Sequence, residues 1–198
     1  MTSVAGLSTI FLLACSAQVG SSSSPAKSGV ESVYTSLTGD SCRTELDKSD
    51  PNETPYQVCP GVAGYSLIVR RVDSGRRSID VVDPARRAHP LDYQRFVTRH
   101  MFSLGDKAEW RVAARNGQQV PIALIAHVRA REDNKSPEKV TQTYVAVAKI
   151  GPGEACVTDS VAEGSQSDAW VRGAADSAQE KKCAPPRPPL TVNGTVVR

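Results

Sequence analysis

Residues 107–131 read KAEWRVAARNGQQVPIALIAHVRAR and decide the fold, because apolar and polar residues alternate on both sides of Asn116-Gly117. Alternation with a period of two is the pattern of a strand with one buried face, and Asn-Gly is typical of a tight hairpin turn. The alternating apolar positions are Ala108, Trp110, Val112, Val120, Ile122, Leu124, Ala126 and Val128. The stretch therefore predicts two long antiparallel strands joined by a short turn.

The register of this hairpin depends on the length of its turn. A two-residue loop places Trp110 opposite Ala123, whereas a three-residue loop places Trp110 opposite Ile122. A slip of one residue moves every side chain of a strand to the other face of the sheet. Because only the second register puts Trp110 with the apolar series, we expect a three-residue loop with Gly117 in the left-handed conformation.

Further strands are expected on both sides of this hairpin. Residues Tyr65–Val72 and Arg76–Asp83 flank Asp73-Ser74-Gly75, a short turn ending in glycine, and Lys139–Ile150 forms another long alternating stretch. Consecutive strands joined by short connections favour an antiparallel meander. The sequence predicts an α+β fold built mainly from an antiparallel sheet of about four to six strands.

Two helices are expected against this sheet. Residues Asp92–Leu104 carry apolar side chains at helical spacing, with Gly105 as the stop. In Ser167–Lys182, the residues Trp170, Ala174 and Ala178 form a stripe at a spacing of four. We expect one or two packed helices, the second with its small-residue face close to the sheet.

Composition excludes several classes of protein. The chain has 198 residues, 39% hydrophobic and 23% charged, which is the composition of a globular domain and not of a disordered chain. Its formal net charge of +3 is too small to indicate nucleic-acid binding, so no nucleic-acid partner is expected.

Cysteine parity predicts two disulfides. The chain has five cysteines, of which Cys15 lies in a leader-like segment, and the other four can pair in three ways. Proximity in sequence favours Cys42 with Cys59 and Cys156 with Cys183. Because no CxxC spacing occurs, we do not expect zinc. No other metal and no cofactor are expected. Paired cysteines indicate an oxidising compartment.

The N-terminus predicts export. Residues Val4–Ala14 are uncharged and mostly apolar, a stretch too short to span a hydrocarbon core of ~30 Å but suited to a secretory signal. The tetrapeptide Leu12-Leu13-Ala14-Cys15 resembles the bacterial lipobox, which implies a signal peptide over 1–15 and lipidation of Cys15. No Lys or Arg precedes the apolar run, and cleavage after Ala17 is the alternative.

The chain divides into segments of different composition. Residues 16–28 (SAQVGSSSSPAKS) predict a flexible linker, and residues 184–198 predict a Pro-rich flexible tail. A single globular domain is expected between them, over residues 29–183.

No motif for catalysis is present. The chain lacks GxGxxG, GxxxxGK[ST], HExxH and GxSxG, and the spacing of His89, His100 and His127 supplies neither a nucleophile nor a set of metal ligands. We therefore expect a protein that is not an enzyme. His127 is expected on a partly solvated sheet face, His100 at the boundary of a helix and His89 in a loop.

Four arginines form the candidate binding site. Arg70, Arg71, Arg76 and Arg77 flank the Asp73-Ser74-Gly75 turn and would gather at one hairpin tip. Such a tip suits phosphate, anionic lipid or peptidoglycan carboxylates. The alternative is a solvated hairpin end, neutralised by neighbouring aspartates. Adjacent residues on a strand point to opposite faces, so Arg70 and Arg71 share a patch only where strand pairing has ended.

The mature domain resembles an uncharacterised family of exported bacterial proteins. The resemblance rests on CPGVAGY at residues 59–65 and LGDKAEWRV at residues 104–112. It extends over about residues 33–183. The resemblance implies a domain of its own kind and transfers no catalytic residue.

These observations together predict an exported lipoprotein, anchored on the periplasmic side of the bacterial cell envelope, that acts as a non-catalytic binding or structural module. A membrane contacted through the lipid anchor and an anionic envelope component or protein are the expected partners. The alternatives are a secreted soluble protein, an inhibitor of a secreted hydrolase that uses the loop 132–138, and an envelope enzyme without a recognisable motif.

Overall fold

The computed structural model describes residue 1 and residues 29–133, 136–192 and 195–197. The expected signal segment, Cys15 and the linker 16–28 lie outside the described residues. Within the described ranges, no helix is long and apolar enough to cross a membrane.

Two antiparallel sheets of five strands each form the body of the domain. The first sheet contains, in spatial order, β1 (Val30–Ser36), β7 (Met101–Arg115), β8 (Gln118–Arg131), β9 (Gln142–Gly151) and β10 (Glu154–Ala162). The second sheet contains β2 (Arg43–Leu46), β3 (Pro55–Pro60), β4 (Ser66–Arg71), β5 (Arg77–Val82) and β6 (Ala88–Pro90). The predicted antiparallel α+β fold is confirmed, with the strands divided between two sheets.

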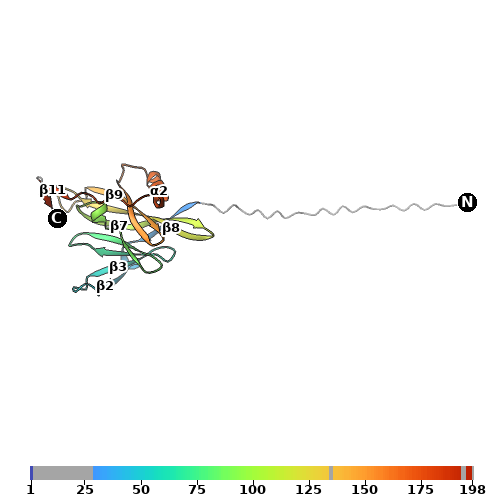
Figure 1. The fold of residues 1–198 in the computed structure, drawn as a ribbon, viewed down its shortest axis with the longest axis horizontal. Coiled ribbons are helices and arrows are strands. Elements are labelled where there is room, and N and C mark those ends of the chain that lie inside the picture. Colours follow the sequence, from blue (N-terminus) through green and yellow to red (C-terminus); the bar gives the residue numbers. More distant parts are fainter. Residues whose placement is uncertain (2–28, 134–135, 193–194, 198) are drawn as a thin grey trace.

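The two sheets pack face to face over the main hydrophobic core (Figure 1). One face of the first sheet contributes Trp110, which is fully buried, and the second sheet contributes Leu67 and Ile79. The indole Nε1 of Trp110 donates to Thr35 Oγ1 at 2.9 Å, so the largest buried side chain leaves no polar atom unpaired. Burial of apolar area between the sheets is the main force that holds them together.

Helix α2 (Asp168–Asp176) covers the other face of the first sheet, as Figure 1 shows. Ser167 caps the helix by accepting from the backbone N–H of Trp170, as its residue type favours. The buried residues are Val171, Ala174, Ala175 and, in the following 3₁₀ turn η2 (Ala178–Glu180), Ala178. The helix is confirmed, but the predicted stripe was wrong at Trp170, which lies on the exposed side.

The predicted helix over Asp92–Leu104 was wrong beyond its first turn. Helix α1 covers only Tyr93–Phe96, and the chain enters β7 at Met101. Phe102 pairs with Ala130 of β8 and is fully buried between the sheets. Residues 102, 104, 108 and 110 also fit a strand period, and pairing with the far end of β8 decided between the two patterns.

The turn of the β7–β8 hairpin also differs from the prediction. Arg115 pairs with Gln118, so the loop has two residues, and Asn116 and Gly117 both have positive φ (51° and 74°), as a type I′ turn requires. A bulge between the pairs Val112–Pro121 and Arg111–Ala123 adds one residue on β8. The bulge places Trp110 opposite Leu124. The extra residue in β8, and not a longer turn, therefore brings the apolar residues of the two strands to the same face.

Both predicted disulfides are present. Cys42 is bonded to Cys59, and Cys156 is bonded to Cys183. The first joins the start of β2 to β3, and the second joins β10 to the segment that follows η2. In the segment expected to be a tail, Leu190–Val192 and Thr195–Val197 form the strand pair β11–β12.

Candidate functional site

Two of the four arginines of the β4–β5 hairpin are held in ion pairs, and the other two are not. Its turn is built on Asp73, whose Oδ1 accepts from the backbone N–H groups of Gly75 and Arg76, each at 3.0 Å. The Asp73 Oδ2 accepts from Arg76 Nε at 2.6 Å, and Arg76 Nη1 donates to the carbonyl oxygen of Arg99 at 2.8 Å. Partial burial works against the carboxylate, but these hydrogen bonds hold the pKa of Asp73 below its usual value. Arg76 is thereby a structural part of the turn.

Arg70 is also occupied. Its Nη2 lies 2.5 Å from Oδ2 of Asp80, a carboxylate that is buried on the outer side of the second sheet. Burial raises the pKa of Asp80 above its usual value, and the positive charge of Arg70 offsets only part of that effect. The charge of Arg70 therefore partly offsets the energetic cost of burying the Asp80 carboxylate.

Arg71 and Arg77 remain free. They are exposed, lie directly opposite each other at the last pair of the β4–β5 ladder, and make no side-chain hydrogen bond or ion pair with the described residues. Together with Thr44 and Gln57 they line a small cavity of about 170 Å³. Because β4 remains paired through Arg71, Arg70 and Arg71 point to opposite faces, and the four arginines do not form one patch.

The histidines lie on separate elements. His89 Nε2 lies 3.3 Å from Asp83 Oδ2, and His127 Nδ1 lies 3.1 Å from Glu163 Oε1. Hydrogen bonds from the backbone N–H of Arg87, from His89 and from the Arg87 side chain lower the pKa of Asp83 to about 2. Among the residues with described positions, no three His, Cys, Asp or Glu side chains are grouped as metal ligands.

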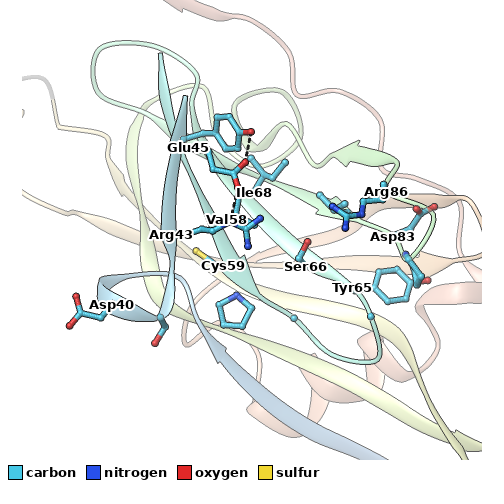
Figure 2. Close-up of a pocket in the computed structure, with 17 residues that line it drawn as sticks. Asp40, Arg43, Glu45, Val58, Cys59, Tyr65, Ser66, Ile68, Asp83 and Arg86 are labelled. Atoms are coloured by element: carbon cyan, nitrogen blue, oxygen red, sulfur yellow. Dashed lines mark hydrogen bonds and ion pairs between the residues drawn. The ribbon is translucent and has the colours of Figure 1, made fainter. Parts of the chain in front are cut away.

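A hollow of the described surface lies on the outer face of the second sheet (Figure 2). It has a volume of about 680 Å³. Val58 and Ile68, neighbours across β3 and β4, form the floor together with Ser66. Arg43 and Arg86 stand on opposite sides of this floor, as Figure 2 shows. We call this hollow the outer-face pocket.

Sequence reasoning missed the outer-face pocket, although it left a signal. Apolar residues occupy both faces of β3 and β4, and on the outer face Val58 and Ile68 are only half-buried. A strand covered on one side alone needs apolar residues only on that side. The apolar side chains of Val58 and Ile68 on the outer face therefore indicate a surface to which a ligand can bind.

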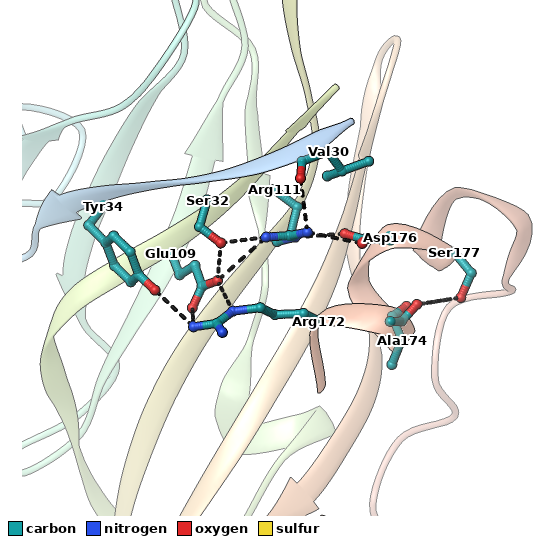
Figure 3. Close-up of polar contacts among 10 residues, drawn as sticks. Val30, Ser32, Tyr34, Glu109, Arg111, Arg172, Ala174, Asp176 and Ser177 are labelled. Atoms are coloured by element: carbon teal, nitrogen blue, oxygen red, sulfur yellow. Dashed lines mark hydrogen bonds and ion pairs between the residues drawn. The ribbon is translucent and has the colours of Figure 1, made fainter. Parts of the chain in front are cut away.

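A polar cluster joins helix α2 to the first sheet (Figure 3). Arg111 is buried and makes two hydrogen bonds to the carboxylate of Asp176, from Nε to Oδ1 at 2.6 Å and from Nη2 to Oδ2 at 3.0 Å. Arg172 of the helix donates from Nε to Oε1 of Glu109 at 2.7 Å, and Ser32 Oγ donates to the same oxygen at 2.5 Å. Desolvation disfavours the charged form of Glu109, but its hydrogen bonds hold its pKa below the usual value.

The cluster is structural. Each of its charges has a partner, because Arg111 pairs with Asp176, and Arg172 pairs with Glu109 and also donates to Tyr34 Oη at 3.0 Å. Sequence reasoning missed it too. The signal was Glu109 and Arg111, which alternate with Trp110 and so face away from the main core.

No protein-family model, no curated protein and no solved structure matches this chain. The resemblance to exported bacterial proteins stays a prediction, and a function has to be argued from the chemistry of the chain's own residues.

Proposed function

We propose that this protein is an exported, non-catalytic binding module of the bacterial cell envelope, tethered by a lipid on Cys15, and that Arg71 and Arg77 contact an anionic partner. The observation that carries the proposal is the pairing of these two exposed arginines. Like charges directly opposite each other in a ladder are destabilising, and neither guanidinium has a counter-ion among the described residues.

The surroundings of the pair favour a phosphate or carboxylate group. An anion between the two guanidinium groups would remove their repulsion and accept hydrogen bonds from both. The hydroxyl of Thr44 and the amide of Gln57, which line the same small cavity, add two neutral donors. Arg70 and Arg76 support the site from their own ion pairs and hold the hairpin in shape.

Other observations support the location. The two disulfides fit an oxidising compartment such as the periplasm. Cys15 lies outside the described residues, so its lipidation rests on the sequence alone. Intact mass of the mature protein tests it, because an acylated chain beginning at Cys15 and a chain beginning at Gln18 have different masses.

The binding proposal is tested with the full chain carrying C15S, so that binding does not come from the lipid. The probes are phosphatidylglycerol vesicles and purified peptidoglycan sacculi, whose anionic groups are phosphate and carboxylate. Each basic side chain at an anionic lipid surface contributes about 1 kcal/mol. R71Q/R77Q should therefore weaken binding to at least one probe more than tenfold.

The matched control is K107Q/K182Q, which removes the same charge at two exposed lysines that form no side-chain hydrogen bond or ion pair with the described part of the chain. It should change binding by less than about twofold. If both double variants lost binding equally, the overall charge of the protein, and not the Arg71–Arg77 pair, would explain the effect. Unchanged binding in R71Q/R77Q would overturn the proposal.

A further inference from the structure

We infer that the outer-face pocket is a second, independent binding site, for a small apolar carboxylate that pairs with Arg86. The site is separate from the Arg71–Arg77 pair. Arg86 lies in the loop between β5 and β6, and Arg71 and Arg77 lie at the opposite end of β5.

Arg86 is the one positively charged side chain of the pocket that makes no hydrogen bond or ion pair within the described residues. Arg43 donates from Nε to Oε1 of Glu45 at 2.6 Å, and the other oxygen of Glu45 accepts from Tyr56 Oη at 2.8 Å. Asp83 is likewise occupied, by Arg87 and His89. Arg86 makes no side-chain hydrogen bond or ion pair with any described residue, and its charge acts on Glu45 only at longer range. An anion in the pocket would therefore find the guanidinium N–H groups unoccupied.

The backbone conformation of Arg86 also supports a binding role. Its φ is 65°, in the left-handed region that glycine and asparagine occupy more easily than arginine. A turn residue chosen for stability alone would be glycine or asparagine at this position. Strained residues of this kind gather at functional sites, where the side chain gives a benefit beyond folding.

Size and lining define the rest of the ligand. The volume of about 680 Å³ is in the range of small-molecule sites. Val58, Ile68 and Val82 give an apolar floor, and Tyr65 stands beside it, as Figure 2 shows for Tyr65 and Ile68. An apolar body over this floor, with one carboxylate at Arg86, satisfies both parts of the surface.

Charge in the pocket favours a single negative charge. Glu45 and Asp83 are neutralised by Arg43 and Arg87, and Asp40 stands at the edge of the pocket as a further carboxylate. A doubly charged phosphate would have one free guanidinium and three carboxylates near it. A monocarboxylate, whether a free acid or the C-terminus of a short apolar peptide, fits better.

Amide NMR titrations of the full chain carrying C15S test this inference. The probes are hydrocinnamate, its neutral amide and the dipeptide N-acetyl-Ala-Phe with a free carboxylate. The backbone amides of Gly64, Ser66 and Ile68 report the location, because these residues line the pocket. We expect hydrocinnamate to shift them and the neutral amide to bind at least about tenfold more weakly. Tighter binding of the dipeptide would identify a peptide C-terminus as the source, and its failure to bind would identify a free acid.

The informative variant is R86N, since asparagine tolerates positive φ. We expect it to keep or raise the urea midpoint while it weakens hydrocinnamate binding about tenfold. R86K retains the charge and should lie between R86N and the wild type. R71Q/R77Q is the matched control and should leave hydrocinnamate binding unchanged.

Three results would overturn the inference. They are the absence of shifts at the pocket amides with either carboxylate, equal binding of the acid and its amide, and unchanged binding in R86N. Because R86N should leave vesicle and sacculus binding intact, failure of this inference and failure of the Arg71–Arg77 proposal are distinguishable.

Discussion

Arg111 of strand β7 and Asp176 at the end of helix α2 form a two-point ion pair, 65 residues apart in sequence, that fixes the helix to the sheet. The guanidinium side chain is 8% exposed and the carboxylate side chain 35% exposed. The pair thus joins a buried cation to a carboxylate that still reaches solvent.

Removal of the carboxylate should be costly, because it leaves the buried Arg111 with only the more distant carboxylate of Glu109, 3.9 Å away, which already pairs with Arg172. Losing one partner of a fully buried pair costs about 3–5 kcal/mol, and the partial exposure of Asp176 reduces this. We expect D176A to lower the free energy of unfolding by about 2 kcal/mol, measured by urea denaturation.

Two further variants separate the ion pair from simple loss of contacts. R43Q breaks an exposed pair with Glu45 and should leave the urea midpoint close to that of the wild type, because solvent screens the pair. R111M/D176L replaces both charges by apolar groups and should be more stable than D176A. If D176A were as stable as the wild type, the ion pair would not hold the helix.

The stability of the protein should fall in acid because of Asp83. Hydrogen bonds in the folded state lower its pKa from 3.8 to about 2, so the folded carboxylate stays charged to lower pH than the unfolded one. Its stabilising contribution is complete above the unfolded pKa and is lost as the pH falls through the folded pKa. Urea midpoints should therefore drop between about pH 4 and pH 2, and D83N should show a smaller drop and a lower midpoint at neutral pH.

The control for this effect is D40N, at an exposed carboxylate without a hydrogen bond from another described side chain. D40N should follow the wild-type profile. A D83N profile parallel to that of the wild type would show that other groups govern the acid transition.

The two disulfides should differ in their contributions. They close loops of 17 and 27 residues, which the chain-entropy model converts to about 3 and about 3.5 kcal/mol. In addition, β2 is held to β3 by its own ladder, whereas Cys183 lies in a segment without regular secondary structure. We expect C156A/C183A to lose more unfolding free energy than C42A/C59A.

Limited proteolysis tests the same prediction, because it shows where in the chain each double variant is cleaved. C156A/C183A should become sensitive near α2 and η2 before the sheets unfold, since the ends of that segment are then less restrained. Equal sensitivity of the two double variants at this segment would contradict the prediction.

The elements that the sequence predicts correctly are those with local causes. The alternation around Asn116-Gly117, the glycine turn after Asp73 and the alanine spacing of α2 each act over a few residues. Proximity also sufficed for the disulfides, because the bonded cysteines are only 17 and 27 residues apart in sequence.

The elements that the sequence failed to predict depend on distant partners. The β8 bulge that turns Trp110 inward, and the strand that begins at Met101, are selected by pairing between β7 and β8. The candidate sites show the same limit. That Arg70 is neutralised and Arg71 is free follows from the burial of Asp80, which alternation along one strand does not reveal.

The disulfides also determine which parts of the chain bear mechanical load. If tension acts between an anchored N-terminal side and the C-terminal end, it runs to Cys42 and crosses to Cys59 through the covalent bond. It crosses again from Cys156 to Cys183. Residues 43–58 and 157–182 lie outside this covalent path, so strand β2, which carries Arg43 and Glu45, and helix α2 are enclosed between crosslinked cysteines. Even after unfolding, a chain pulled at both ends would not lengthen through these two segments.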